Sequence, residues 1–397
     1  MTATPIPATR YAERLARAQA LLPAQDAAAL LIGVGADLLW LTGYAAMPLE
    51  RLTMLVLPAE GQPSLVVPRL EQGAAQVAPA VAGGLLEMVT WQETEDPFAL
   101  VADRLRASGS RPAVQIGALG GAWGRLGALL ISDGLRAAFL LKLQAAMPDA
   151  AFGLASAVLA DLRAVKDAEE VELLRRAAHA ADRVVAAIAG GRLVGRTEAD
   201  VAREVRDRLV DEGHDEAAFW IVAGGPNSAS PHHAAADRPI RAGEPIMLDI
   251  GGRLGGYSSD ITRTIWVTGD DGAAPDAEFS RLYETLQAAQ AAGRAAVAPG
   301  TTGEQVDLAA RGVIDAAGYG ERFIHRTGHG IGLEGHEEPY IVAGNDRPLV
   351  VGNCFSVEPG IYLEGRFGAR IEDIVVCTTG GAEELNQAPR DLFVVRG

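Results

Sequence analysis

Cysteine is scarce in this chain, which has two cysteines, Cys354 and Cys377, among 397 residues. Each lies within an apolar run that is typical of a β-strand. This placement favours two buried thiols over a disulfide, and a reducing compartment over an oxidising one. A small fold held together by disulfides is therefore not expected.

The sequence has fewer basic than acidic residues. It also shows no long apolar run, and no secretory leader is expected. The chain has 35 Lys and Arg against 51 Asp and Glu, a formal charge of −16, which argues against binding to a nucleic-acid backbone. No apolar run approaches the roughly 20 residues that span a bilayer, and the run from Ala27 to Ala36 ends at Asp37. Charges interrupt the N-terminal MTATPIPATRYAERLARAQALL, so no signal peptide is predicted. We expect a cytoplasmic protein with a small-molecule or peptide partner, and neither a nucleic acid nor a membrane.

The length and the hydrophobic content of 49% suit two globular domains. Short β-like runs alternate with helical stretches in the first part, which indicates an α/β domain over residues 1–163. The charged segment DLRAVKD interrupts this pattern at residues 161–167, and we place the domain boundary there. The β-like runs lie near residues 28–33, 53–57, 64–67 and 113–117.

The second part, residues 164–397, mixes helices and strands. An amphipathic helix opens at EEVELLRR and stops at Gly190 and Gly191, and further helices are expected near residues 197–213 and 276–297. Thr302 and Gln305 have capping-box spacing, which predicts another helix to about residue 317. Strands are expected over residues 218–267 and 320–397.

Four carboxylates and one histidine stand in strand-like or turn-like segments of this second part. If these segments meet, like-charge repulsion forbids the arrangement unless cations occupy it. Two divalent metals carry about the compensating charge, and dinuclear sites activate water for hydrolysis. The residues are Asp249, Asp260, His329, Glu358 and Glu372.

Asp249 and Asp260 flank a glycine-rich turn. Asp249 ends the apolar run PIMLDI, and glycines precede a second run, SSDITRTIWV, that brings Asp260 back. A single aspartate at a strand end usually caps a turn. A pair on the two sides of one hairpin instead favours a shared site.

Glu358 and Glu372 lie on two runs, CFSVEPGIY and ARIEDIVV, which the turn-like EGRFG separates. A hairpin would place the two glutamates side by side. A glutamate in an apolar strand is costly to bury unless it is paired or binds a metal. The alternative to metal binding is an ion pair with Arg370, which shares the strand face of Glu372.

His329 lies in TGHGIG, where the flanking glycines let the backbone approach closely and leave the imidazole able to coordinate. Many histidines are surface residues or support other ligands, and these roles remain alternatives. One nitrogen donor among four carboxylates suits Mn²⁺, Co²⁺, Fe²⁺ or Zn²⁺ and argues against Ca²⁺.

The segments LDIGGRLGGYSSDITRT, HRTGHGIGLEGHEEP, FSVEPGIY and ARIEDIV resemble, in this order, those of the metallopeptidases with the pita-bread fold. These include prolidase, aminopeptidase P and, more distantly, methionine aminopeptidase. The resemblance implies an α+β fold in which a creatinase-like N-terminal domain, residues 1–163, precedes a pita-bread catalytic domain, residues 164–397.

By this resemblance the chain holds two divalent metal ions, with manganese favoured and cobalt, zinc and iron left open. Asp260, His329 and Glu372 are implied to hold one metal. Asp249 with Asp260 and Glu358 with Glu372 would complete the other, so that Asp260 and Glu372 bridge the two ions.

The resemblance also implies residues that face the substrate. His232 in GGPNSASPHH matches a histidine that hydrogen-bonds the substrate near the scissile carbonyl, and the adjacent His233 remains an alternative. His336 matches a second such histidine, and Arg370 matches an arginine two residues before the last ligand. Glu358 is implied to take a proton from the attacking water and pass it to the leaving nitrogen. Surface or ion-paired roles are the alternatives for the histidines and the arginine.

The resemblance implies hydrolysis of the Xaa-Pro bond. A chain near 400 residues with one N-terminal domain is similar to prolidases of bacterial type, whereas aminopeptidase P is commonly longer, so dipeptides are the favoured substrates. Alternatives are an aminopeptidase P, a non-peptidase hydrolase or lyase on an intact metal cluster, and a binding protein. A binding protein should show substitutions among the ligands, and none is present. The resemblance further implies a homodimer.

Overall fold

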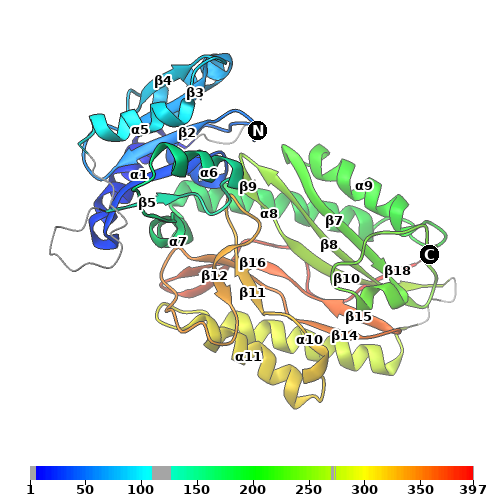
Figure 1. The fold of residues 1–397 in the computed structure, drawn as a ribbon. Coiled ribbons are helices and arrows are strands. Elements are labelled where there is room, and N and C mark those ends of the chain that lie inside the picture. Colours follow the sequence, from blue (N-terminus) through cyan, green and yellow to red (C-terminus); the bar gives the residue numbers. More distant parts are fainter. Residues whose placement is uncertain (1–5, 110–126, 270–271, 273, 397) are drawn as a thin grey trace. The chain divides into compact units, whose positions relative to one another are not determined.

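The computed structural model describes residues 6–109, 127–269, 272 and 274–396. Contacts divide the chain into a unit from Ile6 to Arg163 and a second unit from Ala164 onward. Each is described by itself below, and Figure 1 shows both. Within the described residues, every helix is too short or too polar to span a bilayer.

The first unit contains one mixed sheet whose strands follow the order β4-β3-β2-β1-β5-β6 among the described residues. The central strand β1 is buried along its whole length. It pairs antiparallel with β2 on one side and parallel with β5 on the other. The predicted strand at residues 113–117 lies outside the described residues. The strands are β1 Ala27–Gly33, β2 Met54–Pro58, β3 Ser64–Pro68, β4 Glu87–Trp91, β5 Ala128–Ile131 and β6 Phe152–Leu154.

Helices accompany this sheet and supply its apolar core. Phe98 and Val101 of α5 pack with Leu31 and Val56 of the sheet. The central strands are apolar along their whole length, as is typical of strands that are covered on both faces. The helices are α1 Ala8–Leu21, α2 Ala36–Thr42, α3 Gln72–Gln76, α4 Pro79–Ala82, α5 Pro97–Ala107, α6 Ala137–Ala146 and α7 Ser156–Ala164.

The helices of the second unit begin at capped positions. Thr302 and Gln305 form the predicted capping box at the start of α11, which confirms that prediction. Equivalent boxes open α8 and α9, so each helix has a defined first residue. The helices are α8 Ala168–Ala189, α9 Glu198–Asp211, α10 Ala277–Ala295 and α11 Gly303–Ala316.

Two larger sheets and one hairpin complete the second unit among its described residues. One sheet has the order β18-β10-β8-β7 with β9 added to β8, the other has the order β12-β11-β13-β16-β17, and β14 pairs with β15. The strands are β7 Glu216–Gly224, β8 Glu244–Leu254, β9 Tyr257–Ser258, β10 Ile261–Thr268, β11 Gly328–Gly330, β12 Glu337–Ile341, β13 Cys354–Val357, β14 Gly360–Leu363, β15 Phe367–Arg370, β16 Asp373–Thr378, β17 Gly381–Glu384 and β18 Phe393–Arg396.

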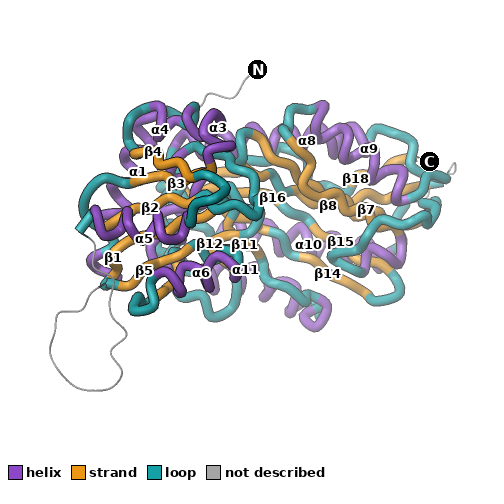
Figure 2. Tube along the Cα trace, turned by 45° about the horizontal axis from the view of Figure 1, so that its top comes forward, coloured by secondary structure: helices purple, strands orange, loops and turns teal. Residues whose placement is uncertain are grey.

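Each sheet of the second unit is covered by a pair of helices. Helices α8 and α9 lie against β7 and β8, and α10 and α11 lie against the strands of the other sheet and hairpin (Figures 1 and 2). Val184, Val205 and Leu248 form part of the first core and are fully buried. The sheets therefore turn their other faces toward each other, and the predicted ligands lie there.

Candidate metal centre

The hairpin of β8 and β10 brings Asp249 and Asp260 to one place. Asp249 pairs with Thr262 across the hairpin, and the same register places Asp260 opposite Gly251. Gly251 is required there, because a Cβ atom would lie 2.2 Å from the carbonyl oxygen of Ser259. The two aspartates are 7% and 5% exposed. The predicted hairpin is thus confirmed, and both carboxylates are buried within it.

Glu358 and Glu372 lie opposite each other. Val357 pairs with Asp373 and Gly360 with Arg370, so the register aligns the two glutamates between them, as predicted. The runs are not continuous strands, because each breaks at its glutamate, between β13 and β14 and between β15 and β16. At these breaks the glutamate amides bond to other segments, that of Glu358 to the carbonyl of Thr327 at 2.8 Å and that of Glu372 to the carbonyl of Thr262 at 3.1 Å.

The two hairpins meet at Glu372 and Thr262. The amide of Glu372 donates to the carbonyl of Thr262 at 3.1 Å, and the hydroxyl of Thr262 donates to Glu372 Oε2 at 2.6 Å. The buried guanidinium of Arg263 donates to the carbonyl oxygens of Thr262 and Glu372 at 2.9 and 2.6 Å. All four carboxylates therefore converge although they come from two hairpins that lie far apart in the sequence.

His329 approaches this cluster on β11. A Cβ at Gly328 would lie 1.9 Å from the carbonyl oxygen of Ser356, and one at Gly330 would lie 2.2 Å from that of Glu338. Glycine on both sides therefore permits the close approach that the sequence predicts. The amide of His329 donates to Ser356 Oγ at 3.0 Å, which holds the backbone in place.

The imidazole of His329 turns Nε2 toward the carboxylates. Its Nδ1 donates to the carbonyl of Gly330 at 3.1 Å, so Nε2 carries the lone pair and faces Glu358 Oε1 at 3.3 Å and Asp260 Oδ2 at 3.7 Å. Burial, and secondarily the charge of His336, lowers the pKa of His329 to about 3. The ring is therefore neutral over the physiological range, as metal binding requires.

Ligand atoms of these residues lie within 4.8 Å of one another in three groups. One contains His329, Glu358 and Glu372, and a second contains Asp249, Asp260 and Glu372. The resemblance had grouped Glu358 with the ion at Asp249, whereas the structure groups Glu358 with His329.

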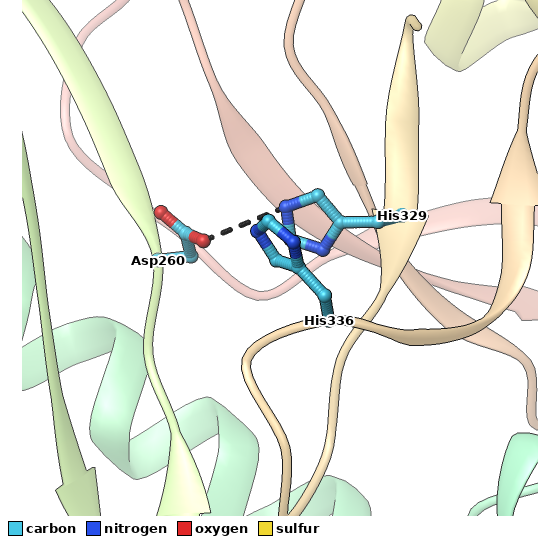
Figure 3. Close-up of side chains that lie close together, drawn as sticks. All are labelled: Asp260, His329 and His336. Atoms are coloured by element: carbon cyan, nitrogen blue, oxygen red, sulfur yellow. Dashed lines mark ion pairs between the residues drawn. The ribbon is translucent and has the colours of Figure 1, made fainter. Parts of the chain in front are cut away.

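The third group consists of Asp260, His329 and His336 (Figure 3). The two imidazole rings have centroids 3.9 Å apart, and His336 is exposed. The sequence predicted His336 as a residue that faces the substrate, and the structure places it beside His329 and Asp260.

The electrostatics of the cluster fit a divalent cation. Burial, followed by the neighbouring carboxylates, raises the pKa values of Asp260 and Glu372 well above their usual range. Burial raises the pKa of Glu358 to about 7. Asp249 Oδ1 is buried and has no hydrogen-bond partner among the described residues. A cation would supply the partner for that oxygen and stabilise the ionised carboxylates.

Arg370 is the counter-charge within the cluster. It is 3% exposed, and its guanidinium donates to Asp249 Oδ2, to the hydroxyl of Thr262 at 2.9 Å and to the hydroxyl of Tyr362 at 2.9 Å. The Tyr362 hydroxyl lies 2.8 Å from His325 Nε2, whose Nδ1 faces the carbonyl of Arg326. Sequence reasoning missed Thr262, Tyr362 and His325 in this network, although each lies within four residues of a predicted ligand.

A cavity of about 780 Å³ opens onto the ligands, and its wall includes His232, His325, Arg326 and His336. This volume is within the range of small-molecule sites. His233 has a different role, because its Nε2 lies 2.8 Å from the buried carboxylate of Glu198. Of the two adjacent histidines, His232 is the one that lines the cavity.

The protonation of Glu358 leads to a prediction for stability. Its pKa is about 7 in the fold against an ordinary value of 4.5, so the metal-free fold binds the extra proton. That contribution is complete below about pH 4.5 and is lost as pH rises through about 7. A bound cation displaces the proton, so we expect the gap in Tm between metal-loaded and metal-free protein to widen from about pH 5 to about pH 8. Calorimetry at each pH measures it.

Glu358→Gln is the control for this prediction, because glutamine keeps the shape of the side chain and cannot ionise. The gap should depend less on pH in this variant than in the parent protein. A gap that is constant with pH in both proteins would contradict the prediction.

A largely buried set of one imidazole and four carboxylates that faces a cavity is typical of metal-dependent hydrolytic enzymes. Two family models match the chain, the metallopeptidase family M24 over residues 172–379 and the creatinase/prolidase N-terminal domain over residues 14–165. The chain belongs to metallopeptidase family M24. It is therefore a peptidase of a metal-dependent family, with an N-terminal creatinase domain and a C-terminal pita-bread domain, as the sequence predicted.

Individual relatives match almost the whole chain. It is 46% identical over 386 residues to the probable dipeptidase PepE of Mycobacterium tuberculosis, covering 97% of this chain and 96% of that one. It is 33% identical over 359 residues to the Xaa-Pro dipeptidase of Lactobacillus helveticus, covering 90% and 92%. The crystal structure of dipeptidase PepE from Mycobacterium ulcerans matches with a TM-score of 0.88 at 44% identity, covering 99% of this chain and 100% of that one.

Proposed function

We propose that the protein hydrolyses the Xaa-Pro bond of dipeptides with the help of two divalent metal ions, manganese being the favoured one. The observation that carries the proposal is the convergence of His329 and the four carboxylates in two ligand groups that share Glu372. Relatives named dipeptidase and Xaa-Pro dipeptidase support the substrate class. The volume of the cavity suits a small peptide.

When bound, the cations would lower the pKa of coordinated water and polarise the scissile carbonyl. Glu358 lines the cavity and its Oε1 lies 3.3 Å from His329 Nε2, and by the resemblance it would take a proton from the attacking water and later give it up. The leaving group is a secondary amine, which requires that proton before it departs. Glu358 is thus the proposed proton carrier as well as a ligand.

His232 and His336 are the proposed substrate-facing residues. Both are exposed and line the same cavity as the ligands. His232 would donate a hydrogen bond to the carbonyl oxygen as that oxygen gains negative charge. His336 would position the peptide.

Arg370 is proposed to contact the free carboxylate of the substrate. A guanidinium has five N–H groups. Three of them take part in the hydrogen bonds described above, so two donors remain for a ligand in the cavity that Arg370 helps to line.

A panel of substrates tests the proposed function. We expect protein stripped with a chelator to be inactive, and reconstitution with about two Mn²⁺ per chain to restore hydrolysis of Xaa-Pro dipeptides. Dipeptides without proline and Xaa-Pro tripeptides should react more slowly. Kinetics alongside elemental analysis of the metal content give both results.

Other outcomes of the same panel have defined meanings. Comparable or faster rates on Xaa-Pro tripeptides would assign the protein to the alternative, an aminopeptidase P. Loaded protein that cleaves none of the peptides would favour a non-peptidase hydrolase or lyase. Full activity with less than one metal per chain would contradict the dinuclear mechanism.

The resemblance also leads us to propose a homodimer that resides in the cytoplasm. Light scattering at micromolar concentration tests the assembly, and fractionation of cells tests the location. A fully active monomer would contradict the first.

A further inference from the structure

Glu198 is a buried carboxylate outside the metal centre that collects hydrogen bonds from several parts of the second unit. It is the first residue of α9 and is 0% exposed. Its Oε1 accepts from the amide of Gly224 at 2.8 Å and from Asn227 Nδ2 at 2.9 Å. Its Oε2 accepts from the amide of Ala236 at 3.2 Å and faces His233 Nε2 at 2.8 Å.

These partners belong to the chain that leads from β7 past the cavity. The backbone of α9 adds two contacts, because the amides of Glu198 and Ala199 donate to the carbonyls of Arg238 and Ala236 at 3.1 and 3.0 Å. The segment from Gly224 to Arg238 is thus attached to the start of α9 at both ends.

His232 lies within a tight turn of this segment. The amide of His233 donates to the carbonyl of Ser230 at 3.2 Å, which closes a turn over residues 230–233. His232 is the third residue of that turn, and no hydrogen bond holds its imidazole among the described residues. The direction of its side chain therefore depends on how the two ends of the turn are held.

We propose that Glu198 and His233 are positioning residues that direct His232 into the cavity. The contact between His233 and Glu198 holds the end of the turn, and the side chain of His233 points to α9 while His232 lines the cavity. Misplacement of a substrate-facing group by about 1 Å can cost up to about a hundredfold in rate. Loosening the turn should therefore slow catalysis through His232.

The proposal rests on the proposed function, and a double-mutant cycle with His232 tests it. We expect His233→Ala to lower kcat on an Xaa-Pro dipeptide about tenfold, with the Mn²⁺ content unchanged. His233→Gln should recover most of the loss, because its amide can donate to Glu198. In a His232→Ala background, His233→Ala should have no further effect, because the residue through which it acts is absent.

Asn227→Ala is the matched control. It also removes a hydrogen bond to Glu198, yet it leaves the contact of His233 intact, so its effect on kcat should be much smaller. Equal losses from His233→Ala with and without His232, or an equal loss from Asn227→Ala, would overturn the proposal. A purely structural role would lower Tm and kcat together in both backgrounds.

Glu198→Gln is a second variant, which should slow turnover at least as much as His233→Ala. It should also accelerate amide hydrogen exchange at Ala236, whose N–H donates to the carboxylate. If this variant does not fold, the double-mutant cycle of His232 and His233 still tests the proposed positioning role. If His232→Ala alone leaves turnover unchanged, the proposed role of His232 fails, which is distinct from failure of the positioning role.

Discussion

Replacing Glu372 with alanine is expected to abolish binding of both metal ions and to reduce turnover at least about a thousandfold. Glu372 belongs to two of the three groups, so its loss leaves both of these incomplete, and the third group, Asp260 with His329 and His336, offers one carboxylate. Cations that stabilise charge in the transition state supply several kcal/mol, and about 4 kcal/mol corresponds to this factor. Elemental analysis and steady-state kinetics measure the two effects.

Asp249→Ala should behave differently, because it removes a ligand from one group and spares His329, Glu358 and Glu372. We expect this variant to keep about one ion per chain. Glu364→Ala is the control for charge, since Glu364 is exposed on the turn between β14 and β15. A Glu372→Ala protein that retains two ions and turns over normally would refute the dinuclear assignment.

The convergence of the five proposed ligands could be predicted from the sequence because each lies in a segment with a readable local pattern. Glycines mark the turn between Asp249 and Asp260, and glycines flank His329. The hairpin expected around EGRFG aligned Glu358 with Glu372, and the observed register agrees. The local sequence pattern was therefore enough to place a residue wherever a hairpin, or a close approach of two backbone segments, determines its position.

The partners of these residues depend on contacts that local pattern does not contain. Thr262 bonds Glu372 and Arg370 across more than 100 residues, through a bridge between two separate hairpins. The choice between His232 and His233 likewise depends on Glu198, which lies at the start of a different element. Neighbouring residues of the same type differ here because a distant helix holds one of them.

Three strands of the first sheet were missed in the prediction from sequence, β4 and β6 at its two edges and the interior strand β5. The strands near residues 28–33, 53–57 and 64–67 are apolar and buried, and the structure confirms them as β1, β2 and β3. Strand β4, Glu87–Trp91, was missed because it lies at the edge of the sheet and is mostly exposed or half-buried. Apolar periodicity is a poor signal for a strand that has one neighbour.

Arg370→Lys is expected to reduce kcat/KM for an Xaa-Pro dipeptide by about 10- to 100-fold. The guanidinium donates to three acceptors at once, and an ammonium group keeps the charge without the planar fork that reaches them. Losing a charge-assisted hydrogen bond costs about 1.5–3 kcal/mol of transition-state stabilisation. Kinetics with the reconstituted protein measure the loss.

Comparing substrates with a free and an amidated C-terminus distinguishes carboxylate recognition by Arg370 from a purely structural role of Arg370. If Arg370 binds the free carboxylate, the loss should be smaller for the C-terminally amidated peptide, which offers no carboxylate to a bidentate donor. Arg326→Lys is the matched variant, because Arg326 is the other guanidinium in the cavity wall and has no carboxylate partner among the described residues. Equal losses on free and amidated substrates from Arg370→Lys would leave Arg370 as the counter-charge of Asp249 alone. A selective loss from Arg326→Lys would then assign carboxylate recognition to Arg326.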